Sequence, residues 1–219
     1  MKGRAISQEE FTKMLSVTEA IVGAAAKDSW IHVLEGLWSS AFRLEELMNL
    51  SWDIPGTIRP IWTQNSYPVI LIPAELQKNN TEETIPLLPW FESLLDRTPS
   101  NLRHGWIFRP QALIGRKGAS SPDYRPKSDW VGKVISRIGK KASVIVAQGD
   151  ERTGRSTKYA SAHDLRRSCS ERMRNSGVPP LIICRILRHV SWETLRKFYA
   201  VGEIQSEAST LRGILGENK

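Results

Sequence analysis

The stretch SAHDLRRS, residues 161–168, is the most informative part of this 219-residue chain. Ser161 and Asp164 stand three residues apart, which is the spacing of a capping box and predicts that a helix begins here. His163 then lies in the first turn, and Arg166, three residues later, shares its face of the helix. The N–H groups of a helix N-terminus, an imidazole and a guanidinium can together bind a phosphate group. Taken alone, a histidine and an arginine at this spacing more often only cap or pack a helix.

The half of the chain around this stretch is strongly basic. Residues 101–219 carry 23 Lys and Arg against 10 Asp and Glu, whereas residues 1–100 carry 8 against 13. Clustered positive charge favours a nucleic-acid partner because binding releases condensed counterions, although charge alone fits a solubilising surface equally well. The longest uncharged apolar run, residues 68–74, is far too short to cross a bilayer, and residues 1–11 lack the apolar core of a signal peptide. Two cysteines fit a reducing cytosol.

The hydrophobic periodicity predicts an α+β fold that is mainly helical, with a small antiparallel β-sheet. Two runs rich in β-branched and aromatic residues, 57–63 and 67–73, predict a hairpin, and residues 84–87 a third strand. Gly, Pro and charged residues predict connections at 109–127 and 148–158. We expect one compact unit over residues 1–219. Helices are expected from Ser7 to about 22 and at about 29–40, 44–50, 89–97, 128–141, 163–175, 180–188, 192–199 and 204–215.

In order and spacing, several motifs of the chain resemble the catalytic domain of tyrosine recombinases, the phage integrase family. That family's pattern is an Arg with a Glu three residues later, a Lys on a β-hairpin or its loop, H-x-x-R, then L-G-H and a Tyr. This chain has FRLEEL at 42–47, a hairpin followed by a lysine, HDLRRS at 163–168 and LRHVSWETLRKFY at 187–199. The resemblance covers about residues 5–205, and the matching positions are Arg43 with Glu46, Lys78, His163 with Arg166, His189 and Tyr199.

The resemblance implies a covalent reaction at a DNA phosphodiester. Tyr199 would attack the scissile phosphorus, giving a 3′-phosphotyrosyl bond and a free 5′-hydroxyl. His163 would be the general base or a proton shuttle for the phenol, and Lys78 would protonate the leaving 5′-oxygen.

The other matched residues would act on the phosphate itself. Arg43 and Arg166 would bind the non-bridging oxygens and stabilise the charge that develops on them, and His189 would add a hydrogen bond. Glu46 would have a supporting role, orienting Arg43 or capping nearby backbone. No metal or other cofactor is expected, because the guanidinium pair supplies the positive charge and the sequence has no HExxH or paired-cysteine motif.

The sequence departs from the family pattern at three points, of which the first is that Lys78 lies beyond the second predicted strand of the hairpin. Arg188 stands where Gly is usual, which adds charge near the phosphate. Tyr199 lies ten residues after His189, where nine is commoner, and the ninth position holds Phe198, which has no nucleophile. Additional DNA contacts are expected from the basic residues Arg167, Arg188, Arg116, Lys117 and Arg155.

The expected partner is double-stranded DNA, on which the chain would self-associate into a tetrameric synapse. A tail helix at about 202–215 has one apolar face that would pack either in trans on a neighbouring subunit or on its own domain. The helical domain that precedes the catalytic domain in family members is expected to be absent, since Arg43 arrives after only about 40 residues. The expected location is the cytoplasm of a bacterial or phage-infected cell.

Three other functions remain open at this point. A type IB topoisomerase-like enzyme uses closely similar residues but reseals the same strand. A non-catalytic DNA-binding module could retain the fold, although the full set of matched residues argues against it. A metal-dependent nuclease would lose its activity in EDTA.

Overall fold

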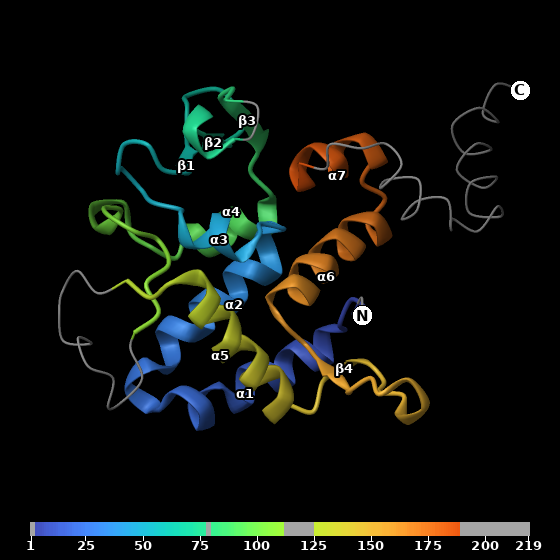
Figure 1. Cartoon of the computed structure of the whole chain (residues 1–219). Coiled ribbons are helices and arrows are strands. Elements are labelled where there is room, and N and C mark those ends of the chain that lie inside the picture. Colours follow the sequence, from blue (N-terminus) through green and yellow to red (C-terminus); the bar gives the residue numbers. More distant parts are fainter. Residues whose placement is uncertain (1–2, 78–79, 112–124, 189–219) are drawn as a thin grey trace, which may run out of the picture.

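The computed structural model describes residues 3–77, 80–111 and 125–188 and has the predicted α+β architecture (Figure 1). Its α-helices are α1 (Gln8–Val22), α2 (Lys27–Ser40), α3 (Leu44–Met48), α4 (Pro89–Leu95), α5 (Ser128–Lys141), α6 (Ala162–Asn175) and α7 (Pro180–Leu187). Its strands are β1 (Arg59–Ile61), β2 (Val69–Ile72), β3 (Glu83–Pro86), β4 (Ile145–Ala147) and β5 (Lys158–Tyr159). Short 3₁₀ turns are η1 (Ala24–Ala26), η2 (Ala74–Leu76), η3 (Ser100–Leu102) and η4 (Glu151–Thr153).

Helix α2 is the centre of the hydrophobic core. Its predicted apolar stripe is confirmed, since Trp30, Leu34 and Leu37 are completely buried. The helix packs against α1, α4 and α6, and Phe11 of α1 stacks on Trp38 with ring centroids 4.4 Å apart. Burying side chains of this size gives about 2 kcal/mol each relative to exposure, so α2 fixes the positions of the elements around it.

The three-stranded sheet confirms the predicted hairpin and third strand. Its order is β1-β2-β3 with antiparallel pairing, and Ile70 lies opposite both Pro60 and Ile85. Strands β1 and β2 are shorter than the predicted runs, and the connection between them includes Asn65, which adopts a positive φ of 61°. Strand β3 contacts α7, so this sheet lies beside α7 at the top of Figure 1.

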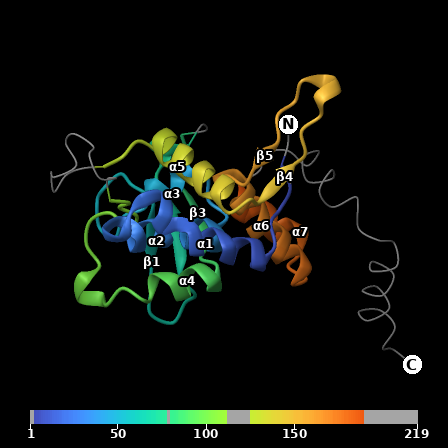
Figure 2. The same cartoon turned by 90° about the horizontal axis from the view of Figure 1, so that it is seen from below.

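A second sheet, β4–β5, was missed by the sequence prediction. Its strands have three and two residues, too few to show an alternating pattern, and the predicted 148–158 connection is the projecting arm of this hairpin (Figure 2). The close approach of α5 to the end of β5 depends on Gly139. A Cβ there would lie 2.2 Å from the carbonyl oxygen of Ala160. This contact fixes the chain just before α6 begins.

Helices α6 and α7 are joined by a separate apolar cluster. Cys169 and Met173 of α6 pack with Ile183, Ile186 and Leu187 of α7. These contacts bring the C-terminal end of α7 back to the middle of α6. None of the helices in the described parts of the chain has the length and apolar character that a bilayer-spanning segment needs.

Candidate active site

Arg43 and Glu46 are placed by the turn between α2 and α3. Ala41 ends α2 in a left-handed conformation with φ 60°, and Arg43 then adopts an extended conformation as the N-cap of α3. The Glu46 carboxylate accepts hydrogen bonds from the Arg43 backbone N–H at 2.8 Å and from its guanidinium at 2.6 Å. The capping acid of α3 therefore also orients the Arg43 side chain, half of which remains exposed.

Arg166 reaches the same carboxylate from α6. Its side chain is 6% exposed, its Nη1 lies 3.4 Å from Glu46 Oε2, and its Nη2 donates to the Leu187 carbonyl at 2.6 Å. Burial, followed by repulsion from Arg43, lowers the pKa of Arg166 to about 10. Arg166 is still charged at neutral pH, and its contacts hold the guanidinium in one orientation. The structure thus brings together Arg43 and Arg166, residues that are 123 positions apart in the sequence.

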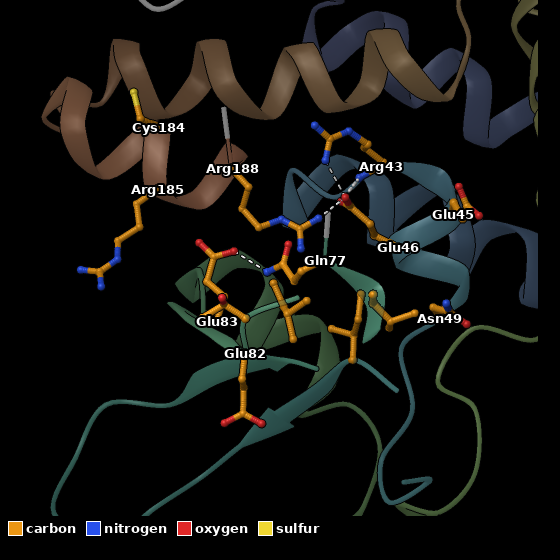
Figure 3. A pocket seen from close by; sticks show the side chains of 14 residues that line it. Arg43, Glu45, Glu46, Asn49, Gln77, Glu82, Glu83, Cys184, Arg185 and Arg188 are labelled. Carbon is orange, nitrogen blue, oxygen red and sulfur yellow. Dashed lines mark hydrogen bonds and ion pairs between the residues drawn. The ribbon is translucent and has the colours of Figure 1, made fainter. Parts of the chain in front are cut away.

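Arg188 is a third cation on Glu46. Its guanidinium donates to Glu46 Oε1 from the end of α7 (Figure 3). Burial of the Glu46 carboxyl acts to raise its pKa, but the charge of Arg188, the hydrogen bonds from Arg43 and the charge of Arg166 outweigh it, so this pKa lies below its ordinary value. Glu46 is therefore ionised at neutral pH.

His163 lies in the first turn of α6, where the predicted capping box is present. The Asp164 carboxylate accepts from the Ser161 N–H at 3.1 Å and from its hydroxyl at 2.6 Å. The His163 side chain is exposed on the same helix as Arg166. Partial burial, followed by the charge of Arg167, holds the pKa of His163 below its ordinary value. The imidazole is consequently neutral at pH 7, the form that accepts a proton.

A pocket of about 1000 Å³ opens beside Glu46. Helix α7 covers one side of it with Arg185 and Arg188, α3 contributes Arg43 and Glu46, and the region around β3 forms the opposite side (Figure 3). Arg166 contacts Glu46 but does not line this pocket, and neither does His163. The full lining is Arg43, Glu45, Glu46, Asn49, Ile58, Ile72, Leu76, Gln77, Thr81, Glu82, Glu83, Cys184, Arg185 and Arg188.

Two of the predicted DNA-binding residues lie away from this pocket. Arg167 pairs with Asp164 at 2.9 Å, and its side chain is 17% exposed. Arg155 is exposed on the β4–β5 hairpin, where it forms an isolated bridge with Asp150. The remaining predicted site residues lie outside the described residues: Lys78, Arg116, Lys117, His189, Tyr199 and the tail at about 202–215.

The contact of Arg188 with Glu46 was not foreseen from the sequence, and neither were the pocket residues Asn49, Gln77 and Cys184. The only sequence signal was Arg188 itself, which occupies a position where glycine is usual. Among the described residues, no three His, Cys, Asp or Glu side chains gather as a metal ion would require.

Comparisons with known proteins bear on the family and the fold of this chain. The model of the phage integrase family matches residues 4–203, and a search of curated proteins found no significant match. Solved structures with a similar fold include the XerA recombinase (TM-score 0.54, 16% identity, covering 97% of this chain and 64% of that one). The Tn1549 transposon integrase in complex with transposon right end DNA is also similar (0.59, 16%, 98% and 66%), as is a lambda integrase dimer bound to a core site (0.56, 14%, 90% and 60%).

This chain therefore spans about 60 to 66% of the length of those three structures. At such low identity they show the fold, whereas the family match extends over 200 of the 219 residues. The fold, the motif order and the family match lead to one conclusion: this chain belongs to the phage integrase family.

Proposed function

We propose that this chain cleaves and rejoins DNA strands as the catalytic domain of a site-specific recombinase, through a 3′-phosphotyrosyl intermediate. The observation that carries the proposal is the convergence of Arg43 and Arg166 on Glu46, in a member of the phage integrase family. Two guanidiniums that share one carboxylate are close enough to bind two oxygens of one phosphate. Their charge would stabilise the pentacoordinate phosphorus as it forms.

The proposed reaction has two balanced transfers. The Tyr199 hydroxyl attacks the scissile phosphorus, its proton passes to the neutral imidazole of His163, and the bond between phosphorus and the 5′-oxygen breaks. Lys78 gives a proton to the leaving 5′-oxygen, and His189 donates a hydrogen bond to the phosphate. Rejoining runs the same steps in reverse with a 5′-hydroxyl as the nucleophile. The phosphotyrosyl bond retains the energy of the broken phosphodiester.

The proposed partner is double-stranded DNA, bound as a tetrameric synapse, with the tail at about 202–215 packing between subunits. The basic balance of residues 101–219 supports the DNA partner. The proposed location is the cytoplasm of a bacterial or phage-infected cell. The free thiols of Cys169 and Cys184 fit such a reducing compartment.

A covalent trapping experiment tests this function. The probe is a pool of random-sequence DNA duplexes that each carry one 5′-bridging phosphorothiolate, because the 5′-thiol released by cleavage rejoins poorly and the adduct accumulates. Wild-type protein should form an SDS-resistant adduct whose DNA is recovered and sequenced, and Tyr199→Phe should form none. An adduct that persists in Tyr199→Phe would mean that another residue is the nucleophile.

Two further arms separate the alternatives. Adduct formation in EDTA should equal that without it, whereas a metal-dependent nuclease would lose its activity. With the recovered site on two DNA molecules, a recombinase exchanges strands between them, whereas a type IB topoisomerase-like enzyme only relaxes supercoiled plasmid. Absence of any wild-type adduct would support a non-catalytic DNA-binding module instead.

A further inference from the structure

Arg188 occupies a backbone position that favours glycine. Helix α7 ends at Leu187, and Arg188 follows with φ 50° and ψ 47°, which is the left-handed region. An L-residue with a long side chain is strained there, and glycine is not. The local backbone therefore does not explain why an arginine stands at position 188, whereas the contacts of its side chain do.

The Arg188 side chain completes the coordination of Glu46. It is 10% exposed and donates to Glu46 Oε1, the same oxygen that accepts from the Arg43 guanidinium. The other oxygen, Oε2, accepts from the Arg43 backbone N–H and faces Arg166 Nη1. An ionised carboxylate has about four acceptor sites, so these contacts use all of them. Removing Arg188 would leave one site empty and would let the Arg43 guanidinium shift along the carboxylate.

The net charge of the cluster formed by Glu46, Arg43, Arg166 and Arg188 also favours a role for Arg188 in the reaction. Glu46 contributes one negative charge and would offset half of the positive charge on Arg43 and Arg166. Arg188 adds one positive charge, so the net charge of the cluster again equals that of Arg43 and Arg166 together. A phosphodiester carries one negative charge and gains more as the nucleophile attacks, so the reaction benefits from a cluster whose net charge stays above that of a single cation.

We propose that Arg188 is a positioning residue for strand cleavage, which acts by holding Glu46 so that Arg43 and Arg166 remain oriented toward the phosphate. This inference rests on the proposed function and deepens it. Arg188 does not touch the phosphate in this scheme. Its backbone position also links it to the site, because the preceding carbonyl, that of Leu187, accepts from Arg166.

A double-mutant cycle tests the inference. Arg188→Gly, Glu46→Gln and the double variant are compared by the single-turnover rate of adduct formation on the recovered phosphorothiolate site. We expect Arg188→Gly to slow the reaction about tenfold, as the loss of one charge-assisted hydrogen bond would. In the Glu46→Gln background, loss of Arg188 should have little further effect. Losses that multiply would show that Arg188 acts independently of Glu46 and would overturn the inference.

The controls separate folding from positioning. Arg185→Ala removes a charge from the last turn of the same helix, where Arg185 is exposed and lines the same pocket, and its effect should multiply with that of Glu46→Gln. Arg188→Asn, which tolerates the left-handed backbone, replaces Arg188→Gly if the glycine variant unfolds in urea earlier than wild type. In Arg188→Gly and in Arg188→Asn, the affinity for DNA should change by a smaller factor than the rate of adduct formation.

The failure of the inference is distinguishable from the failure of the proposed function. If wild-type protein forms no adduct, the proposed function fails and the inference fails with it. If wild-type protein forms the adduct but Arg188 and Glu46 show no coupling, only the inference fails.

Discussion

Two carboxylates in this molecule occupy the same local position but differ in what surrounds them. Glu46 and Asp164 are each the third residue of a helix and each accepts a hydrogen bond from the N-cap backbone. Each is also surrounded by basic groups. Asp164 is completely buried, with Lys158 at 3.3 Å and Arg167 at 2.9 Å. Glu46 is 14% exposed and lines a pocket.

The difference arises from what covers each carboxylate. The N-terminal segment passes over Asp164 so closely that a Cβ on Gly3 would lie 2.1 Å from its Oδ1, and the Ile6 N–H donates to Ser168 on the same helix at 2.8 Å. No such segment of the described chain closes the pocket beside Glu46. The comparison teaches that a capping acid with cationic partners is structural where the chain covers it. Where a pocket lies beside it, the same arrangement can position groups for a ligand.

The largest effect on stability is expected at Asp164, the carboxylate that the chain covers. Asp164→Asn removes the charge that Lys158 and Arg167 share, so we expect the free energy of unfolding to fall by about 3 kcal/mol. Urea denaturation measures this loss. Glu45→Gln, at an exposed acid in the first turn of α3, is the matched control and should change stability by less than about 0.5 kcal/mol. Equal unfolding curves for Asp164→Asn and wild type would contradict the structural role.

Beside the pocket, a substitution of a Glu46 partner should change activity rather than stability. Arg43→Ala should slow adduct formation by about 10² to 10³, the usual loss for one group that stabilises developing negative charge. The free energy of unfolding should change by at most about 1 kcal/mol, since the Arg43 side chain is half exposed. Arg97→Ala breaks another exposed ion pair, with Glu35, and should leave the adduct rate unchanged. If Arg43→Ala lowered the free energy of unfolding by more than it raised the activation free energy of adduct formation, the contrast between Glu46 and Asp164 would disappear.

Acid unfolding gives a smaller and separate measure of Glu46. Its folded pKa lies below its ordinary value of 4.5, so the ionised form is favoured by folding. This stabilisation is fully present above about pH 4.5 and is lost as the pH falls through the lower, folded pKa. Glu46→Gln should cost about 1 to 3 kcal/mol at neutral pH, and its stability should fall less steeply than that of wild type below pH 4.5. Parallel curves for the two proteins would contradict the lowered pKa.

The smallest effect is expected at Arg155, which belongs to neither cluster. It is exposed on the β4–β5 hairpin, so Arg155→Ala should change the free energy of unfolding by less than about 0.5 kcal/mol. If it contacts a DNA phosphate, the slope of log affinity against log salt concentration should fall by about 1. Fluorescence anisotropy with a labelled duplex measures this slope. An unchanged slope would exclude Arg155 from the DNA interface.

Local patterns predicted most of the fold because they report short-range physics. The apolar stripe of α2, the capping box at Ser161 and the strands around residues 57–87 all depend on residues a few positions apart. Helix ends and strand lengths shifted by a few residues, as the short α3 (Leu44–Met48) illustrates. The β4–β5 sheet escaped prediction because its strands are too short to carry a period.

The sequence by itself determined which residues bear charge, where the helices begin to within about two residues and which motifs follow one another. It placed an acid three residues after both Arg43 and Ser161 but could not distinguish the two. Only the tertiary structure decided that Arg166 and Arg188, 120 and 142 residues after Glu46, contact its carboxylate. It also decided that Asp164 is completely buried. The physical reason is that capping is fixed by hydrogen bonds within one turn, whereas burial and ion pairing depend on which distant segments the core packs together.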